Sequence, residues 1–290
     1  MEYRQLPKGK ETEKLSAIGL GMGGIQNNSS EEITAIVSHA IAGGINFFDL
    51  CGAAANIYRP FGEAIAGRRE KVLFQLHFGA VYNQKGEYGW SRNLAEIQQT
   101  FHWELEQLGT DYVDFGFLHC IDEDQDWQEI QANGILDYVQ TLKEQGIVKH
   151  IGFSSHTPSV AQQVIDSGGI DLFMFSINPA YDWEKGDEYG IGSAKERAAL
   201  LRRCQAEKIG ISVMKPFHGG QLLDSKTSPF REKLTHYQCL QYALDRPAVL
   251  SVVPGVQTMA DLELLLGFDQ STEAEKDYSC IGNFLPAQAI

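Results

Sequence analysis

Short apolar runs alternate with amphipathic stretches along almost the whole chain of 290 residues, and this alternation limits the possible folds more than any other feature. Each run is short enough to be one buried strand, and many of the stretches between runs carry the i, i+3, i+4 spacing of amphipathic helices. The eight runs cover residues 17–21, 45–49, 72–77, 112–119, 150–154, 172–177, 211–215 and 250–253. We therefore predict the α/β class and a single domain over residues 1–290, folded as a closed (β/α)8 TIM barrel.

Two polar segments interrupt this pattern. Residues 3–16 contain the turn residues Pro7 and Gly9, and we predict that they form an N-terminal β-hairpin outside the barrel. Residues 82–90 are predicted to form a long loop, with Ser91 capping the helix that follows.

The composition narrows the classes of function. The formal net charge is -14, which would repel phosphate backbones, so nucleic acid is not an expected partner. No apolar run approaches the ~20 residues of a membrane span, and no hydrophobic signal region follows Met1. The five cysteines are scattered without a CxxC pair, which favours a reducing compartment, and we predict a cytoplasmic location. We expect a small-molecule substrate, and the sequence does not define an oligomeric state.

Three of the predicted strands end on a side chain that can take part in acid–base chemistry. The second ends at Asp49, the third at His77 and the fourth at His119. Neighbouring strands lie about 5 Å apart and their carboxyl ends meet at one rim of a barrel, so we expect these side chains to converge. A carboxylate near an imidazole favours the protonated ring, which could then act as a general acid. The alternative is that each histidine only satisfies a buried polar need.

Further polar residues are predicted at the same rim. They are His156, Asn178, Tyr181, Lys215 and His218. Imidazole and carboxylate groups suit zinc or iron, but there is no HxH or HExxH spacing, and no metal ligand is predicted. We expect His156 and His218 to be solvent-facing loop residues, and the acidic run over residues 122–126 to form a solvated face.

Turn residues follow the last two predicted strands. Gly219 and Gly220 come after the seventh, and Pro254 and Gly255 after the eighth. Backbone amides in such turns could bind a phosphate, as they often do in barrels. There is no GxGxxG or Walker motif, so a nucleotide would bind without a Rossmann domain.

Several segments together resemble the aldo-keto reductase superfamily over nearly the whole chain. They are residues 18–21 (IGLG), 47–49 (FFD), 111–119 (DYVDFGFLH) and 151–155 (IGFSS). Residues 213–220 (VMKPFHGG) resemble a bacterial branch that normally carries a C-terminal iron–sulfur ferredoxin-like module. Only Cys280 lies near Ile290, so an iron–sulfur cluster is expected only if such a module follows Ile290.

The resemblance implies an NAD(P)-dependent carbonyl reductase with a catalytic aspartate, tyrosine, lysine and histidine. Asp49 matches the aspartate and His119 the histidine. Counting along the chain places His77 at the lysine and Ala54 at the tyrosine, so the tetrad is altered. Tyr58 lies one helical turn beyond Ala54 and matches only if the loop is rearranged. We predict that His77 and His119 share the role of proton donor, held by Asp49, with Tyr58 as a further catalytic candidate.

The resemblance also implies a set of cofactor-binding residues. Ser154 and Ser155 match the serine and asparagine that usually hold the nicotinamide amide, and Asn178 takes the place of a glutamine partner. Met214 stands where an aromatic ring often stacks on the nicotinamide. The predicted set is Met22, Ser154, Ser155, Asn178, Met214, Lys215, Phe217, Gly219, Pro254, Gly255 and Gln257.

We predict that NAD(H) is favoured over NADP(H). Residues 254–261 contain no basic residue, and the resemblance places Gly255 and Asp261 where a lysine and an arginine often bind the 2′-phosphate. An aspartate there would repel that phosphate. NADP(H) binding would need a basic group from another loop, such as Arg59, Arg202 or Lys226.

Two other classes of function remain open. The altered tetrad is also compatible with a non-catalytic barrel that binds a nucleotide or a partner protein. A metal-dependent lyase or hydrolase using Asp49, His77, His119 and His218 is the third reading. Neither the substrate nor the direction of the reaction follows from the sequence.

Overall fold

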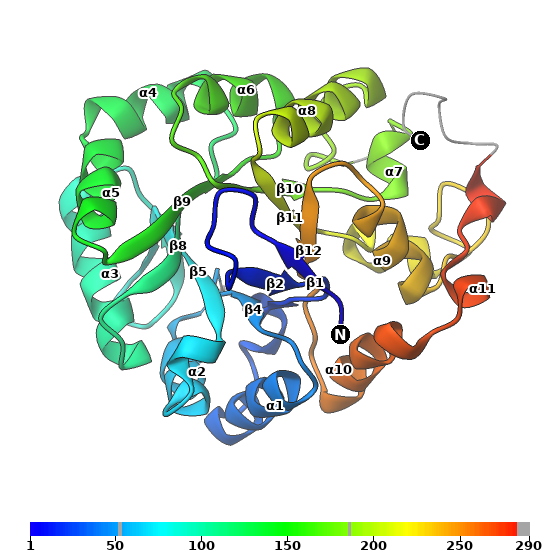
Figure 1. Ribbon diagram of the computed structural model, residues 1–290, viewed down its shortest axis with the longest axis horizontal. Helices are drawn as coiled ribbons and strands as arrows, with labels where there is room; N and C mark the ends of the chain where they lie inside the picture. Colours follow the sequence, from blue (N-terminus) through cyan, green and yellow to red (C-terminus); the bar gives the residue numbers. More distant parts are fainter. Residues whose placement is uncertain (52–53, 185–186, 283–290) are drawn as a thin grey trace.

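The structure, a computed structural model, describes residues 1–51, 54–184 and 187–282. Eight parallel strands close into a barrel surrounded by helices (Figure 1), which confirms the predicted fold. The barrel strands are β3 (Leu20–Gly21), β4 (Phe47–Asp49), β5 (Leu73–Phe78), β8 (Val113–Leu118), β9 (Val148–Ser154), β10 (Leu172–Ser176), β11 (Gly210–Met214) and β12 (Val249–Val252). They neighbour one another in the order β12-β11-β10-β9-β8-β5-β4-β3, and parallel bridges from Ile18 to Val252 and from Gly21 to Gly255 join the two ends.

Helices cover the outside of the barrel and bury the apolar faces that the sequence spacing predicts. In the first of them, Ile33, Ile36, Val37 and Ala40 are buried, and Ser29 begins the helix with a capping box. The helices are α1 (Ser30–Ala42), α2 (Tyr58–Ile65), α3 (Leu94–Leu108), α4 (Asp124–Ala132), α5 (Ile135–Glu144), α6 (Pro158–Asp166), α7 (Pro179–Asp182), α8 (Ala194–Ala206), α9 (His236–Leu244), α10 (Met259–Leu266) and α11 (Glu273–Lys276). Within the described part of the chain, none of the helices has both the length and the apolar character needed to cross a bilayer.

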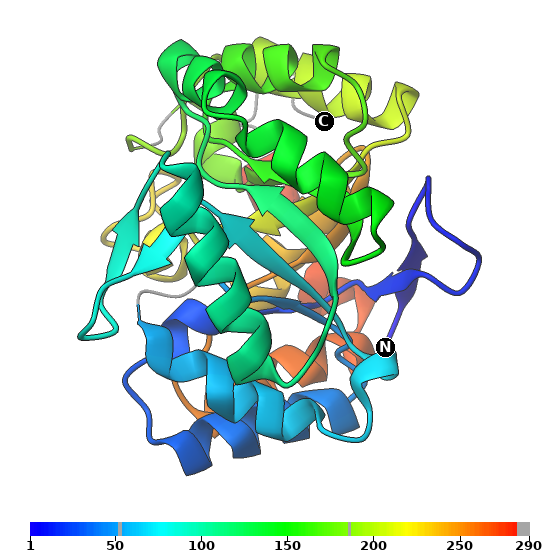
Figure 2. The same ribbon diagram turned by 90° about the vertical axis from the view of Figure 1, so that its left-hand side faces the viewer.

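The N-terminal hairpin, β1 (Tyr3–Gln5) and β2 (Lys14–Ser16), lies across the amino-terminal end of the barrel (Figures 1 and 2). Leu6 and Leu15 are fully buried beside Phe47 and Phe115, which point into the barrel interior. Burial of one leucine side chain stabilises a fold by about 1.5–3 kcal/mol, so the hairpin contributes to the core as well as covering it. The predicted hairpin is therefore confirmed.

A second hairpin, β6 (Ala80–Tyr82) and β7 (Tyr88–Trp90), follows β5 and projects from the opposite end of the molecule (Figure 2). The prediction of a long loop over residues 82–90 is therefore wrong. The side chain of Asn83 accepts hydrogen bonds from the amides of Lys85 and Glu87, and Gly86 turns the chain at φ 76°. The helix α3 that follows is capped by Asn93 rather than by the predicted Ser91.

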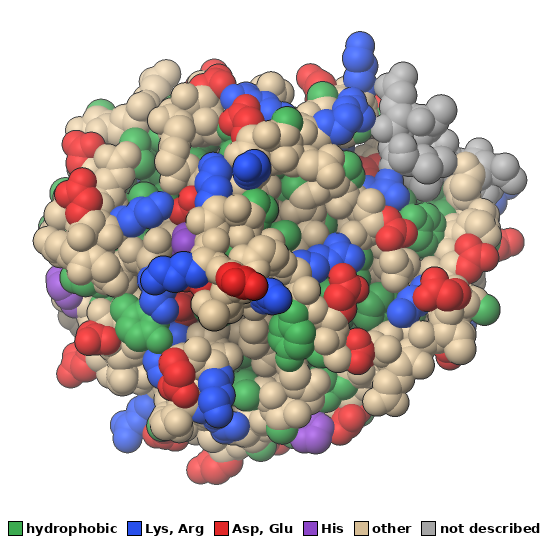
Figure 3. All heavy atoms as spheres, viewed as in Figure 1, with side chains coloured by type: hydrophobic (Ala, Val, Ile, Leu, Met, Phe, Trp, Pro, Cys, Tyr) green, Lys and Arg blue, Asp and Glu red, His purple; other side chains and the backbone are tan. Residues whose placement is uncertain are grey.

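Acidic and basic side chains are interspersed on the face that carries the N-terminal hairpin (Figure 3). Although the formal net charge is -14, the described part of this face carries no extended surface of one charge sign. Electrostatic attraction of a large charged partner depends on such a field, and this face does not supply one.

A buried ion pair between α7 and α8 makes a specific prediction about stability. The guanidinium of Arg197, which is 1% exposed, donates to Asp182 at 3.0 Å, and the other oxygen of Asp182 accepts from Tyr242 at 2.6 Å. Arg197→Ala leaves this carboxylate buried without its counter-charge, so we expect the free energy of unfolding in urea to fall by about 3–5 kcal/mol. The matched change at exposed Arg202 on the same helix should cost about 0.5 kcal/mol or less, and equal losses in the two variants would contradict the argument.

Candidate active site

Asp49, His77 and His119 lie together at the carboxyl ends of three neighbouring strands, as the sequence predicts. β5 runs between β4 and β8, so the residues that end these strands face one another. His77 Nε2 lies 2.9 Å from Asp49 Oδ1, and His77 Nδ1 lies 3.1 Å from His119 Nδ1. All three are buried, and the most exposed of them is Asp49 at 7%.

The carboxylate of Asp49 is held by several donors. Its Oδ1 atom accepts from Gln75 Nε2 at 2.9 Å, from His77 Nε2 at 2.9 Å and from the amide of Cys51 at 3.3 Å. These bonds offset the cost of burying a charge. When Asp49 accepts the Nε2 proton of a neutral His77, the Nδ1 atom of His77 is left to accept from His119.

Tyr88 extends this arrangement to the protein surface. Its hydroxyl lies 2.6 Å from His119 Nε2. When both rings are neutral and His77 donates to Asp49, hydrogen bonds run in one direction, from the Tyr88 hydroxyl through His119 and His77 to Asp49. Tyr88 is 40% exposed, so one end of the chain is accessible to a ligand while the other is buried.

The sequence prediction missed Tyr88 because it treats residues 82–90 as a loop. Tyr82 and Tyr88 flank a turn that contains Gly86, and aromatic residues on both sides of such a turn are a hairpin signal. The hairpin also explains how Tyr88 reaches the site. Ala54, at the position implied for the catalytic tyrosine, forms an antiparallel bridge with Glu87, the residue before Tyr88.

Burial and the charge of Arg92 shift the pKa values of His119 and Tyr88, two members of this series of hydrogen bonds. Burial lowers the pKa of His119 well below its usual value, and the nearby His77 and Arg92 act in the same direction. Burial raises the pKa of Tyr88, with the thiols of Cys51 and Cys120 adding to the effect, whereas Arg92 opposes it. Arg92 is itself 7% exposed and donates to the carbonyls of His119 and Cys120, both at 2.9 Å.

Tyr58 is the first residue of α2 and packs against Tyr82 of the second hairpin. Its hydroxyl donates to the carbonyl of Leu50 at 2.9 Å and lies 2.8 Å from the hydroxyl of Tyr82. Burial raises its pKa well above the usual value, and the carboxyl group of Glu104 adds to this. These contacts link Tyr58 to the hairpin that carries Tyr88. In this structure the Tyr58 hydroxyl bonds to Leu50 and Tyr82, whereas a catalytic role beside His119 would need a rearranged loop.

His156 and His218 are buried, with 8% and 3% of their surfaces exposed, so the prediction that they face solvent is wrong. His156 Nδ1 lies 2.9 Å from Asp122 Oδ2. Although burial opposes it, hydrogen bonding and charge from His156 lower the pKa of Asp122 to about 2. The acidic run over residues 122–126 is therefore not a purely solvated face, because Asp122 also accepts from the thiol of Cys120 at 3.2 Å.

A groove of about 510 Å³ lies beyond the carboxyl ends of β11 and β12. Its lining includes six of the predicted cofactor-binding residues, namely Lys215, Phe217, Gly219, Pro254, Gly255 and Gln257. Gly219 and Gly220 adopt φ angles of 60° and 90°, and a side chain at either position would meet no atom within 4 Å. The turn thus presents open backbone to the groove, as a phosphate cradle requires.

Asp261 also lines this groove. Its Oδ2 atom accepts from the amides of Gln257 at 3.0 Å and Thr258 at 2.9 Å, at the start of α10. The amides that could otherwise bind an anion at this helix N-terminus therefore already bind a carboxylate of the protein.

The residues predicted to contact the nicotinamide form hydrogen bonds to other groups of the protein. Ser154 Oγ accepts a backbone amide at 2.8 Å, and Ser155 Oγ lies 3.3 Å from a carboxylate oxygen of Asp122. Asn178 caps α7 through its oxygen and donates to the carbonyl of Lys215 at 2.9 Å. Met22 is fully buried and Met214 is half-buried at the end of β11.

The fold and the site define a barrel with acid–base groups at the carboxyl ends of its strands, beside a groove suited to a nucleotide. The family profile described as "Aldo/keto reductase family" matches residues 17–238, and the chain belongs to that family. This confirms the prediction of an oxidoreductase enzyme.

Curated relatives are distant in sequence. The chain is 24% identical over 281 residues to "Uncharacterized oxidoreductase YqkF" of Bacillus subtilis (strain 168), which covers 86% of this chain and 85% of that protein. It is 27% identical over 179 residues to the L-glyceraldehyde 3-phosphate reductase of Escherichia coli (strain K12), a match that covers 57% of this chain and about half, 49%, of that enzyme.

Solved structures share the fold across nearly the full chain. The holo form of the aldo-keto reductase AKR11C1 from Bacillus halodurans superimposes with a TM-score of 0.76 at 21% identity, covering 99% of this chain and 97% of that one. An aldo/keto reductase from Klebsiella pneumoniae, solved in complex with NADP and acetate, gives a TM-score of 0.70 at 19% identity and covers 96% and 94% of the two chains.

The buried carboxyl group of Glu104 predicts an unusual dependence of stability on pH. Burial raises the pKa of Glu104 to about 8, even though a hydrogen bond from Tyr58 opposes the shift. Between the unfolded value of about 4.3 and pH 8 the folded state binds the extra proton, so stability falls as the pH rises. Glu104→Gln should therefore gain stability relative to the wild type by about 1.4 kcal/mol per pH unit over this window, measured by urea unfolding at pH 5.5 and 7.5.

The control for this measurement is Glu106→Gln, because Glu106 is an exposed residue of the same helix. Its stability relative to the wild type should not change between the two pH values. A Glu104→Gln variant that also shows no change would mean that Glu104 is ionised in the folded protein.

Proposed function

We propose that the protein reduces a carbonyl compound with a nicotinamide cofactor and that Tyr88 is its proton donor. The observation that carries the proposal is the hydrogen-bonded chain from Tyr88 through His119 and His77 to Asp49. In this reading the altered tetrad keeps Asp49 and His119. Tyr88 supplies the phenol from a different segment, and His77 replaces the lysine.

The bound cofactor would supply the hydride for the carbonyl carbon, and the protein supplies the proton and its positioning. The carbonyl oxygen would accept from the Tyr88 hydroxyl at the exposed end of the chain. For this reaction the Tyr88 hydroxyl must donate its proton to the substrate instead of to His119. The Tyr88 oxygen then accepts a hydrogen bond from the Nε2–H group of His119. That orientation places one additional proton on His77, which then donates to both Asp49 and His119.

Positive charge near Tyr88 would favour the loss of its proton. Two groups can provide it in place of the missing lysine. Arg92 is fixed against the backbone of His119 and opposes the rise in the pKa of Tyr88 that burial causes. His77, whose Nε2 atom lies 2.9 Å from Asp49, would act through His119 when it carries the additional proton.

The residues present fit a nicotinamide nucleotide in the groove beyond β11 and β12. Open glycine backbone at residues 219–220 would receive its phosphates, and Lys215 and Phe217 line the same groove. Ser154, Ser155 and Asn178 remain the proposed contacts of the nicotinamide amide, which would have to exchange with their present partners. Met22 and Met214 also remain proposed cofactor-binding residues.

We propose that residues 1–290 act as one barrel domain with a small-molecule substrate and a cytoplasmic location. A bound iron–sulfur cluster is still expected only if a module follows Ile290.

Replacement of the Tyr88 hydroxyl tests the proposed proton donor. Tyr88→Phe should lower kcat by about 10²- to 10⁴-fold with little change in KM, because general acid catalysis is lost while the ring remains. The measurement is turnover of an aldehyde and quinone panel with NADH and with NADPH. Tyr58→Phe is the control, since it removes a phenol of the same type from the neighbouring packing layer.

The expected control result is near-normal turnover by Tyr58→Phe. A large loss in Tyr58→Phe together with normal turnover by Tyr88→Phe would overturn the assignment. Tight NADH binding without turnover of any compound by the wild type would instead favour the non-catalytic barrel.

Cofactor preference is the second prediction, and it rests on Asp261. The Klebsiella relative was solved with NADP, so the preference for NAD(H) is proposed from this chain alone. A 2′-phosphate near Asp261 would meet a carboxylate that already fills the amides at the start of α10. We expect wild-type protein to bind NADH more tightly than NADPH, and Asp261→Asn to raise NADPH affinity relative to NADH about fivefold, or roughly 1 kcal/mol.

Calorimetric titration of both reduced cofactors measures this preference. The matched control is Glu263→Gln, which removes an exposed carboxylate from the same helix and should leave the ratio of affinities unchanged. Wild-type protein that binds NADPH ten times more tightly than NADH would show that another group, such as Arg59, Arg202 or Lys226, binds the phosphate.

A further inference from the structure

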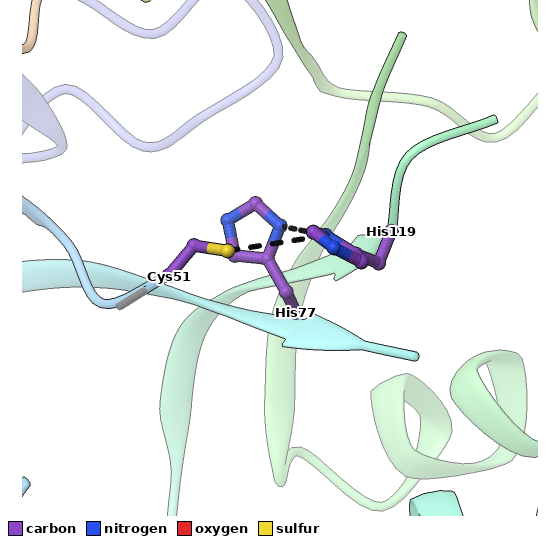
Figure 4. Close-up of side chains that lie close together, drawn as sticks. All are labelled: Cys51, His77 and His119. Atoms are coloured by element: carbon purple, nitrogen blue, oxygen red, sulfur yellow. Dashed lines mark hydrogen bonds between the residues drawn. The ribbon is translucent and has the colours of Figure 1, made fainter. Parts of the chain in front are cut away.

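We propose that Cys51, His77 and His119 form a binding site for a thiophilic divalent cation of the Zn²⁺ type. One ligand atom from each residue lies within 4.8 Å of the other two. Figure 4 shows the thiol and the two imidazole rings pointing toward one another from separate segments of the chain. The site goes beyond the proposed reductase activity, because Cys51 has no role in that reaction.

The spacing of these atoms is close to that of ligands around one tetrahedral ion. With metal–nitrogen bonds of about 2.05 Å and a metal–sulfur bond of about 2.3 Å, ligand atoms lie about 3.3 Å apart for two nitrogens and about 3.6 Å for nitrogen and sulfur. Here the two Nδ1 atoms are 3.1 Å apart, and the Sγ atom of Cys51 is 4.0 Å from His119 Nδ1. Shifts of about 0.5 Å or less would bring these two separations to the tetrahedral values, and the remaining pair lies within 4.8 Å.

The Nε2 atom of each imidazole, on the side of the ring away from the proposed ion, already has a hydrogen-bond partner, as is common in metal sites. His77 Nε2 is hydrogen bonded to Asp49, and a histidine that binds zinc through one nitrogen commonly donates its other N–H to a carboxylate. His119 Nε2 lies 2.6 Å from Tyr88, whose oxygen can accept as well as donate. Both imidazoles are thus oriented with their Nδ1 atoms toward the gap.

The donor set defines the class of ion. One thiolate and two imidazoles suit Zn²⁺ and Co²⁺, whereas Mg²⁺ and Ca²⁺ prefer oxygen ligands. Three protein ligands leave a fourth tetrahedral position for water or another small ligand. A second group, Cys120, Asp122 and His156, contains the same kinds of atoms. There, however, Asp122 is already bonded to both Cys120 and His156.

Metal binding and the proton chain exclude each other. The ion needs the lone pairs of both Nδ1 atoms, whereas the chain needs a proton between them. On binding, Cys51 loses its thiol proton to solvent, and the ring proton of neutral His119 moves from Nδ1 to Nε2 through exchange with water. Zn²⁺ should therefore inhibit any turnover that depends on the chain.

Co²⁺ titration of the chelator-treated full chain tests the site without reference to turnover. We expect one equivalent to produce the visible bands of tetrahedral cobalt and a near-ultraviolet thiolate-to-cobalt band, and we expect Zn²⁺ to abolish both. Cys51→Ser should lose the thiolate band and bind at least about tenfold more weakly. Cys120→Ser is the matched control and should retain the band.

A second measurement needs no variant. Zn²⁺ should slow the alkylation of Cys51 by iodoacetamide, followed by peptide mapping, and leave that of exposed Cys280 unchanged. The absence of a thiolate band in the wild type, or its loss in Cys120→Ser but not in Cys51→Ser, would overturn the proposal. Because both readouts report ion binding, they stand or fall independently of the reductase activity.

Discussion

The buried carboxylate of Asp49 determines how the polar groups at the carboxyl ends of β4, β5 and β8 are arranged. A carboxylate that is 7% exposed needs hydrogen-bond donors, and Gln75, His77 and the amide of Cys51 supply them. Because His77 Nε2 is directed to Asp49, its Nδ1 atom faces His119, and His119 in turn presents Nε2 to Tyr88. While both rings are neutral, the direction of each hydrogen bond from Tyr88 to Asp49 therefore follows from one buried carboxylate.

The scaffold supports this arrangement from both ends of the barrel. The N-terminal hairpin buries Leu6 and Leu15 against the amino-terminal end and so completes the interior beneath the site. The second hairpin projects from the other end (Figure 2). It carries Tyr88, whose hydroxyl lies 2.6 Å from His119 Nε2. Tyr58 and Trp103 pack against Tyr82 with ring-centroid distances of 5.4 and 5.8 Å, which fixes the hairpin to α2 and α3. The packing of its hairpin thus positions Tyr88, a residue outside the predicted strands.

The fold and the buried half of the site could be predicted because both follow from strand periodicity. Asp49, His77 and His119 end apolar runs, and the order of the strands brings such ends together. Tyr88 could not be found in this way, since its strand is three residues long, lies outside the barrel and pairs with β6. The burial of His156 and His218 could not be predicted from strand patterns either, because their partners Asp122 and Asp187 lie in other loops. The groove residues of the last two βα loops converge as predicted, whereas Ser154, Ser155 and Asn178 pair with groups that strand patterns do not reveal.

The central claim is that Tyr88 and His77 act as parts of one proton-donating chain, and a double-mutant cycle tests it most directly. The measurement is the rate of hydride transfer in single turnovers of wild type, Tyr88→Phe, His77→Gln and the double variant, with the best substrate found for the wild type. If the two residues act as one unit, the double variant should be about as slow as the slower single variant, so that the losses are far from additive. Losses that add within about 0.5 kcal/mol would show that Tyr88 and His77 act independently and would contradict the account.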